Sequence, residues 1–248
     1  MYSYFADFYD SLTANVEYEK RADYILEVLK RHNKSSGLIL DLCCGTGSLT
    51  IALKKRGADI FGSDASREML TIAQQKAFEN EENILFINQK MQELSLPYKI
   101  DVCICTLDSV NHITSKQELI KGFSKINSFL EDDGIFIFDA NTVYKHKNIL
   151  GDNCYIYDTK DVFCAWQNNY NPKNNRVIIT LDFFIPNRKG YDRYSEQFSE
   201  RAYTRDEMSE MLNKAGMIIE TVYDDLSFVE PRSDSQREIY IVRKRINE

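Results

Sequence analysis

Short apolar segments alternate with amphipathic ones through the first half of this 248-residue chain and beyond. Apolar residues at helical spacing predict helices, and they occur at residues 17–31, 48–56, 66–78 and 117–130. Shorter apolar runs predict buried strands, at residues 38–42, 59–63, 84–87, 102–106 and 135–138. Strands and helices in this rhythm form a parallel sheet with helices on both faces. We therefore predict an α/β fold.

The pattern changes near residue 150. From there to residue 203 the helical spacing disappears, and aromatic and β-branched runs are separated by turn sequences such as Asn171-Pro172-Lys173-Asn174-Asn175. Such runs predict strands joined by turns. Residues 151–203 are therefore expected to form an antiparallel β insertion.

The helical pattern resumes after the insertion. Thr204 and Glu207 form a Thr-x-x-Glu sequence, which is typical of a capping box at the start of a helix. Two further apolar runs predict the last strands, at residues 217–222 and 238–242. Residues 1–150 and 204–248 are therefore expected to form one domain, interrupted by the insertion.

Composition narrows the classes of function. The chain has 31 Lys and Arg against 38 Asp and Glu, a formal net charge of −7, and nucleic acid is an unfavoured partner because phosphate contacts need clustered basic side chains. No run approaches the roughly 20 apolar residues of a membrane span, and residues 1–7 do not resemble a signal peptide. The six cysteines lack metal-ligand spacing, so we expect reduced thiols, no metal and a cytoplasmic protein. Four cysteines fall in expected strands and should be buried: those at positions 103, 105, 154 and 164.

The most informative motif is the strand end Leu40-Asp41-Leu42 followed by Cys43-Cys44-Gly45-Thr46-Gly47. Two glycines one residue apart let the backbone turn sharply and approach a ligand closely. The helix that follows presents free N–H groups, which favour a carboxylate or phosphate. Asp41 would repel a pyrophosphate but attract an ammonium group, and Asp64, at the end of the next strand, can accept both hydroxyls of a ribose. These residues favour a nucleoside with a zwitterionic tail; an NAD-dependent oxidoreductase is the alternative on a similar sheet.

The stretch Asp41–Gly47, followed by Gly62-Ser63-Asp64-Ala65-Ser66, resembles the first two motifs of class I S-adenosylmethionine-dependent methyltransferases. Tyr4-Phe5-Ala6-Asp7-Phe8-Tyr9-Asp10 is similar to the lid motif of these enzymes, and Asp108-Ser109-Val110-Asn111-His112 to the motif after their fourth strand. The similarity covers nearly the whole chain and points to small bacterial members with a β-sheet insertion, related to glycine and amino-sugar N-methyltransferases. It implies a Rossmann-like seven-stranded sheet with helices on both faces, and an insertion that caps the acceptor side.

The resemblance also implies a set of residues that bind S-adenosylmethionine. In it, Asp41 lies near the ammonium, Asp64 holds the ribose, and Ala65 packs on the adenine. Leu107 contacts the cofactor near its sulfur, and Tyr9 covers the site. The full set is Tyr9, Asp41, Cys44, Gly45, Gly47, Asp64, Ala65, Met91 and Leu107.

Two further positions, Lys90 and His112, also bear on the predicted site. Where relatives have an acid that accepts the adenine amino group, this chain has Lys90, which carries no acceptor; the backbone at Met91 is then the expected adenine contact. His112 follows the fourth strand, near where an acceptor would meet the methyl group, and is the candidate general base or orienting residue. A polar loop residue without a catalytic role is the alternative. Some relatives have a histidine in the strand where this chain has Glu196-Gln197-Phe198.

The expected activity is methyl transfer to a small-molecule acceptor at nitrogen or oxygen. The cofactor itself activates the methyl group, so the protein mainly aligns the reacting atoms. A neutral amine needs less base than a hydroxyl, and the absence of an obvious base favours nitrogen. The alternatives are a non-catalytic S-adenosylmethionine-binding or sensor protein, and an RNA or protein methyltransferase. The chain could form a homodimer.

Overall fold

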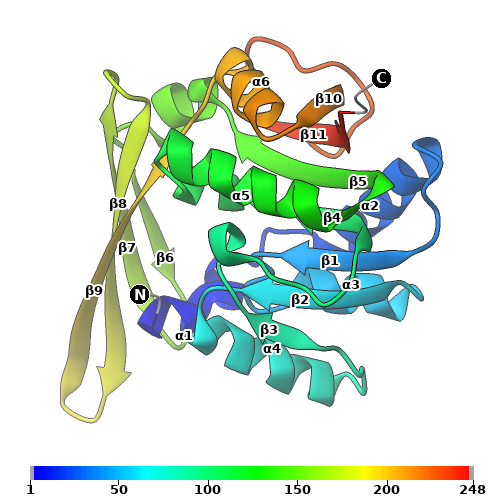
Figure 1. Cartoon of the computed structure of the whole chain (residues 1–248). Coiled ribbons are helices and arrows are strands. Elements are labelled where there is room, and N and C mark those ends of the chain that lie inside the picture. Colours follow the sequence, from blue (N-terminus) through cyan, green and yellow to red (C-terminus); the bar gives the residue numbers. More distant parts are fainter. Residues whose placement is uncertain (1–2, 246–248) are drawn as a thin grey trace.

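A computed structural model describes residues 3–245 and shows two sheets within them (Figure 1). The larger sheet has seven strands in the order β10-β11-β5-β4-β1-β2-β3. Neighbours among β3, β2, β1, β4 and β5 are parallel, and β11 runs antiparallel to β5 and β10. This arrangement confirms the Rossmann-like seven-stranded sheet. Its strands are β1 (Leu38–Leu42), β2 (Asp59–Asp64), β3 (Phe86–Asn88), β4 (Ile100–Cys105), β5 (Leu130–Asn141), β10 (Met217–Asp224) and β11 (Arg237–Lys244).

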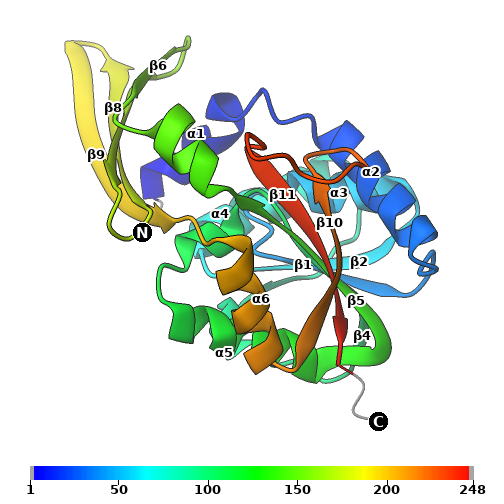
Figure 2. The same ribbon diagram turned by 90° about the horizontal axis from the view of Figure 1, so that it is seen from above.

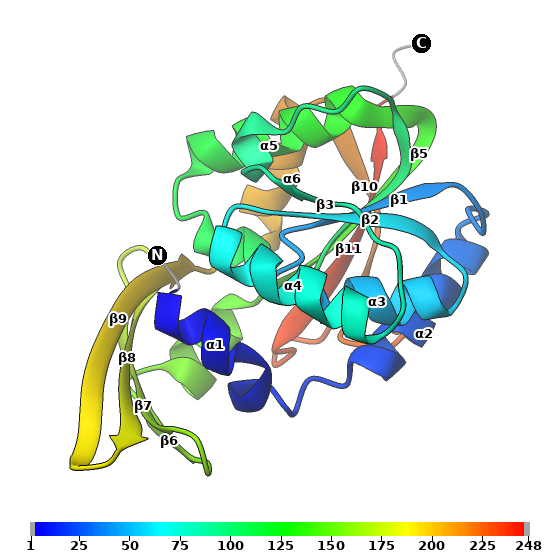
Figure 3. The same ribbon diagram turned by 90° about the horizontal axis from the view of Figure 1, so that it is seen from below.

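Helices cover both faces of this sheet (Figures 2 and 3). They are α2 (Tyr18–Arg31), α3 (Ser48–Lys55), α4 (Arg67–Glu79), α5 (Lys116–Phe129) and α6 (Arg205–Lys214). Successive side chains of a strand point to opposite faces: Leu40 and Leu42 pack with α5 and α6, whereas Ile39 packs with α2 and α3. The α4 helix packs beside α3 and β3. Among the described residues, no helix combines the length and apolar character that crossing a bilayer requires.

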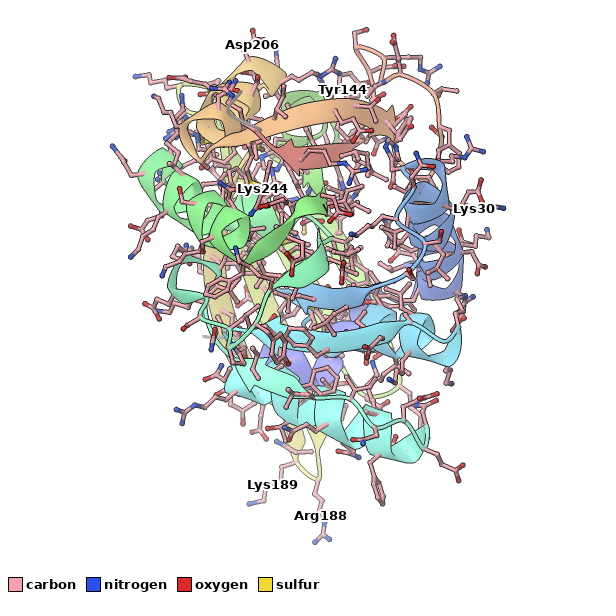
Figure 4. The ribbon with its side chains drawn as sticks, turned by 45° about the vertical axis from the view of Figure 1, so that its right-hand side comes forward. Lys30, Tyr144, Arg188, Lys189, Asp206 and Lys244 are labelled. Atoms are coloured by element: carbon pink, nitrogen blue, oxygen red, sulfur yellow. The ribbon has the colours of Figure 1, made fainter. Side chains whose placement is uncertain are left out.

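The insertion forms a second, antiparallel sheet that stands beside the first (Figure 1). We call it the cap sheet; it comprises β6 (Cys154–Asp158), β7 (Phe163–Asn171), β8 (Arg176–Asn187) and β9 (Gly190–Arg201). One face packs against α1 (Ser3–Leu12), where Phe5 meets an apolar cluster that includes Ile179 and Phe183. The turn between β8 and β9 carries Arg188 and Lys189 away from the rest of the molecule (Figure 4).

The observed elements differ from the expected ones mainly at their ends. The β5 strand begins at Leu130, although only residues 135–138 are expected to be extended. Residues 131–133 are exposed, and the pairing of β5 with β4 shifts register between Ile100 and Val102. A polar start of the strand is tolerated because this part of the ladder is irregular.

Short helices are missing from the sequence prediction. They are η1 (Met91–Glu93), η2 (Ser109–His112) and the π-helix η3 (Lys145–Leu150). A π-helix has no periodic signature of its own, and such turns often occur at functional sites. One cysteine prediction is wrong: Cys154 is exposed, because alternate residues of β6, beginning with Cys154, face solvent. The other three cysteines in strands are buried as expected.

The α6 helix begins with the predicted capping box. Thr204 Oγ1 accepts a hydrogen bond from Glu207 N (3.2 Å), and Glu207 Oε2 accepts one from Thr204 N (2.9 Å). Thr204→Ala should therefore lower the free energy of unfolding by about 1 kcal/mol, as measured by urea denaturation. Ser209→Ala, within the same helix, is the control and should change that free energy by less than about 0.5 kcal/mol. Equal losses in the two variants would contradict the capping role.

Candidate functional site

A cavity of about 470 Å³ lies at the carboxyl ends of β1, β2 and β4. This is the edge at which open α/β sheets bind ligands. Loops that follow these strands form its walls, together with residues of α1 and the start of α3. The residues predicted to form the site line the cavity, with the exception of Gly47; they are Tyr9, Asp41, Cys44, Gly45, Asp64, Ala65, Met91, Leu107 and His112.

The loop between β1 and α3 passes through left-handed backbone conformations. The φ angle is 61° at Cys43, 54° at Gly45 and 73° at Gly47. A Cβ atom at Gly45 would meet no other atom within 4 Å, so this glycine opens onto the cavity. A Cβ atom at Gly47 would lie 3.0 Å from Cβ of Ala73 and 3.1 Å from Cζ of Phe86. One glycine thus leaves space for a ligand, and the other lets the loop pack against α4 and β3.

The carboxylate of Asp64 holds this loop in place from the end of β2. Its Oδ2 accepts a hydrogen bond from Gly45 N (2.9 Å), and its Oδ1 accepts one from Ser66 N (2.8 Å). Burial raises the pKa of Asp64. Each carboxylate oxygen has a second lone pair, so the same group can also accept hydrogen bonds from hydroxyl groups in the cavity.

Asp41 is a second carboxylate at the cavity wall, and it is almost fully buried. Thr50 Oγ1 donates a hydrogen bond to its Oδ2 (2.5 Å). Burial nevertheless raises the pKa of Asp41 to about 7, because desolvation disfavours the charged form. A cationic group in the cavity would offset this cost, whereas a phosphate would increase it.

The turn after β4 is held in an unusual conformation. Leu107 and Asp108 both have left-handed backbone, with φ of 57° and 54°, a conformation that costs side-chain-bearing residues of order 1–3 kcal/mol each. The carboxylate of Asp139 accepts hydrogen bonds from both backbone N–H groups, at 2.8 Å and 2.7 Å. Arg237 of β11 bridges the two acids and donates to Oδ1 of Asp108 at 2.6 Å. This network keeps Leu107 at the cavity wall.

The α1 helix closes one side of the cavity with Tyr9 and Phe5. Burial raises the pKa of the Tyr9 phenol, which therefore stays neutral. Asp10 ties the helix down: it accepts hydrogen bonds from Thr46 Oγ1 (2.8 Å) and Lys76 Nζ (2.6 Å). Neither contact of Asp10 could be predicted from the sequence, because Thr46 and Lys76 lie far from it along the chain.

The region after β3 differs from the expectation in one respect. Lys90 lines the cavity as predicted, and the side chain of Met91 is buried in the core, which leaves its backbone as the polar group there. Gln92 also lines the cavity. Its side-chain amide has a carbonyl acceptor, so Gln92 adds a polar group to the predicted set.

His112, in η2, lines the same cavity as Leu107, and its side chain is 32% exposed. Its Nε2 lies 3.7 Å from Oε1 of Glu200, a buried residue of β9. Glu200 is not among the residues predicted from the sequence, although Glu196 and Phe198 of the same strand are noted there. The period of two along a strand is the signal that places these three residues on one face.

Within residues 3–245, Asp108, His112 and Glu200 are the group whose possible metal-ligand atoms lie within 4.8 Å of one another. The guanidinium of Arg237 contacts Asp108 and already supplies a positive charge there. Lys145 lies close enough to Asp108 and Glu200 to interact with both electrostatically. These charges disfavour a further cation, so we assign no metal to this group.

Fold and site together define a class of protein. The seven-stranded sheet, the glycine loop after β1 and the acid at the end of β2 are typical of Rossmann-like domains that bind a nucleoside. The buried Asp41 beside the loop suits a ligand with an ammonium group rather than a pyrophosphate.

Comparison with known proteins identifies the family. Residues 39–134 match a family model described as a methyltransferase domain. The chain is 31% identical to "Putative methyltransferase YqeM" of Bacillus subtilis (strain 168), over 98% of this chain and 97% of that protein. It is 32% identical to an S-adenosylmethionine-dependent methyltransferase of known crystal structure from Clostridium acetobutylicum ATCC 824, with a TM-score of 0.87 and 98% of each chain covered. The chain belongs to the class I S-adenosylmethionine-dependent methyltransferases, and S-adenosylmethionine is its methyl donor.

A more distant relative carries a specific name. The chain is 28% identical to a glycine/sarcosine N-methyltransferase of Parasynechococcus marenigrum (strain WH8102), over 55% of this chain and 50% of that protein.

Proposed function

We propose that this methyltransferase transfers a methyl group to a small-molecule acceptor, at a nitrogen or an oxygen atom. The size of the site carries this proposal. The 470 Å³ cavity is walled by strand-end loops and by α1, which is backed by the cap sheet. Its volume is in the lower part of the roughly 300–1,000 Å³ range of small-molecule sites, so donor and acceptor have to share a confined space.

The cavity wall suits each part of the methyl donor. Asp41 would meet the ammonium group, and the N–H groups at the start of α3 would face the carboxylate. Asp64 would accept hydrogen bonds from the ribose hydroxyls. Ala65 and the backbone at Met91 would flank the adenine. When bound, S-adenosylmethionine supplies a methyl group already activated by the sulfonium.

The residues at the other end of the cavity would position the acceptor. Leu107 would lie near the sulfur, and His112 lines the same cavity. Tyr9 and Phe5 of α1 would exclude water from this part of the cavity. Alignment of the acceptor with the methyl carbon can supply several kcal/mol of the rate acceleration. An amine acceptor is favoured over a hydroxyl, in keeping with the name of the glycine/sarcosine N-methyltransferase relative.

A panel of acceptors tests the proposal. The protein would be incubated with S-adenosylmethionine carrying a labelled methyl group and with small amines, small hydroxy compounds, a protein mixture and RNA. Label is expected to appear in small molecules, and in amines first. Transfer only to RNA or protein would contradict the proposal. Tight binding of the cofactor product with no transfer to any class would favour a sensor protein instead.

The affinity for S-adenosylhomocysteine should depend on pH through Asp41. In the ligand-free protein burial raises the pKa of Asp41 to about 7, whereas a bound ammonium group would favour the carboxylate and lower that pKa. Below pH 7 binding must therefore release a proton. We expect affinity measured by calorimetry to fall by up to about tenfold per pH unit below 7, and to level off above it.

Asp41→Asn provides the control for this pH dependence. The amide keeps the size of the side chain and a hydrogen bond with Thr50, but it does not titrate. The variant should bind more weakly at pH 8 and show little change in affinity between pH 5.5 and 8. A variant that retains the wild-type pH profile would show that another group is responsible.

A further inference from the structure

The end of β3 and the segment that follows it, residues 88–93, are tied to the end of β2. Asn88 Nδ2 donates hydrogen bonds to the carbonyl oxygens of Asp64 (2.9 Å) and Ala65 (3.0 Å), and Gln89 N donates to that of Asp64 (3.1 Å). A nucleoside carries its base on the ribose, so a ribose bound by the carboxylate of Asp64 brings the base close to this segment. The segment is therefore the part of the cavity wall that would recognise adenine.

The core and a local loop closure fix the backbone of this segment. The side chain of Met91 is 2% exposed and lies against Gly122 of α5, where a Cβ atom would come within 2.7 Å of the Met91 sulfur. Gln89 closes the loop, because its Nε2 donates to the carbonyl oxygen of Ser95 (3.1 Å) and its Oε1 accepts from Ser95 N (2.9 Å). The residues on either side of Met91 are thus held in place at the cavity wall.

Two residues of this segment, Lys90 and Gln92, line the cavity and differ in what they offer a ligand. The ammonium group of Lys90 lies 4.0 Å from Oε1 of Glu93, and the Lys90 side chain is 63% exposed. An ammonium group can only donate hydrogen bonds. Gln92 is half-buried, and its amide offers a carbonyl oxygen as an acceptor. The amino group of adenine is a donor, so it pairs with the amide of Gln92 and not with the ammonium group of Lys90.

We propose that Gln92 recognises the adenine amino group of S-adenosylmethionine, in place of the acid that related enzymes have at the position of Lys90. This inference rests on the proposed orientation of the cofactor. The carbonyl oxygen of Gln92 accepts a hydrogen bond from the amino group, and the backbone N–H of Met91 donates one to the adjacent ring nitrogen. The two contacts together read a donor and an acceptor on one edge of the base.

Removal of the amino group from the ligand tests this contact without knowledge of the methyl acceptor. The two probes are S-adenosylhomocysteine and its analogue in which a hydrogen atom replaces the 6-amino group of adenine. Calorimetry at pH 8 is expected to show that the wild type binds the analogue roughly tenfold more weakly. Gln92→Leu keeps the size of the side chain without its acceptor. This variant should bind S-adenosylhomocysteine roughly tenfold more weakly than the wild type does, and should prefer it to the analogue by less than about threefold.

Three further variants show whether the preference belongs to Gln92. Gln92→Ser is too short to reach the base and should lose the preference as Gln92→Leu does, which decides the matter if the leucine variant does not fold. Gln92→Glu retains an acceptor and should keep the preference. Lys90→Met, in the same segment, is the matched control and should also keep it. The proposal is overturned if the wild type binds both probes equally, or if the Leu and Ser variants keep the wild-type preference.

The same measurements distinguish this proposal from the proposed function. Failure of the wild type to bind S-adenosylhomocysteine, or unchanged binding in Asp64→Ala, would overturn the proposed orientation of the cofactor and this inference with it. Normal binding by the wild type, weakened binding in Asp64→Ala and an unaltered preference in the Gln92 variants would overturn the role of Gln92 alone.

Discussion

Arg237→Met is expected to lower the free energy of unfolding by about 3–5 kcal/mol, the cost of leaving buried partner charges uncompensated. The side chain of Arg237 is 11% exposed and bridges Asp108 and Asp139. Asp139 in turn holds the left-handed turn at Leu107. Loss of the guanidinium would leave the two acids side by side, with Arg21 as the remaining ion-pair partner of Asp139 (3.5 Å), and would release a strained backbone. Urea denaturation monitored by fluorescence measures the change.

Arg205→Met serves as the control for this substitution. Arg205 also contacts an acid, Glu238, at 2.6 Å, but its side chain is half exposed. Exposed ion pairs contribute about 0–1 kcal/mol, so this variant should unfold within about 1 kcal/mol of the wild type. If both arginine variants lose the same small amount, the buried network does not support the turn.

Asp64→Ala should weaken the binding of S-adenosylhomocysteine by about 1–3 kcal/mol, or roughly 5- to 150-fold in Kd. Two effects contribute. The variant loses the charged acceptor proposed for the ribose hydroxyls, and it leaves the N–H group of Gly45 without the carboxylate that holds the loop. Isothermal titration calorimetry at pH 8 gives the affinity under conditions in which Asp41 is mostly ionised.

Asp59→Ala is the control that tests whether loss of any acid of β2 would weaken the binding of S-adenosylhomocysteine. Asp59 begins β2, at the opposite end from Asp64, and it is exposed. Its replacement should change the affinity by less than about 0.5 kcal/mol. Unchanged binding in Asp64→Ala would show that the ribose lies elsewhere.

The sheet could be predicted because its signals are local. Leu38–Leu42 is short, apolar and ends in a glycine turn, and the expected strand matches β1 at both ends. The Thr204 capping box depends on residues three positions apart, and both of its hydrogen bonds are present. The beginning of β5 could not be predicted in the same way. Residues 131–133 are polar and have no partner in the pairing of β5 with β4; they belong to β5 because they form the irregularity between the pairs Ile100–Leu130 and Val102–Ile135.

The cavity residues could be placed for a related reason. In a parallel sheet the carboxyl ends of strands meet at one edge, so Asp41, Asp64 and Leu107 converge once the strands are known. The partners of these residues could not be placed. Arg237 reaches Asp108 across 129 positions, and Lys76 reaches Asp10 across 66. No periodicity relates such distant residues.

Local chemistry therefore accounts for the succession of helices and strands along the chain, for the glycine turn and for the two acids at adjacent strand ends. Each of these features depends on neighbours within a few residues. Folding in three dimensions adds what depends on distance and burial. It brings Glu200 to His112, places Arg237 beneath the turn at Leu107, and desolvates Asp41 enough to raise its pKa to about 7. The free energies of charges change steeply with separation and with exposure to water, and neither quantity exists until the chain has folded.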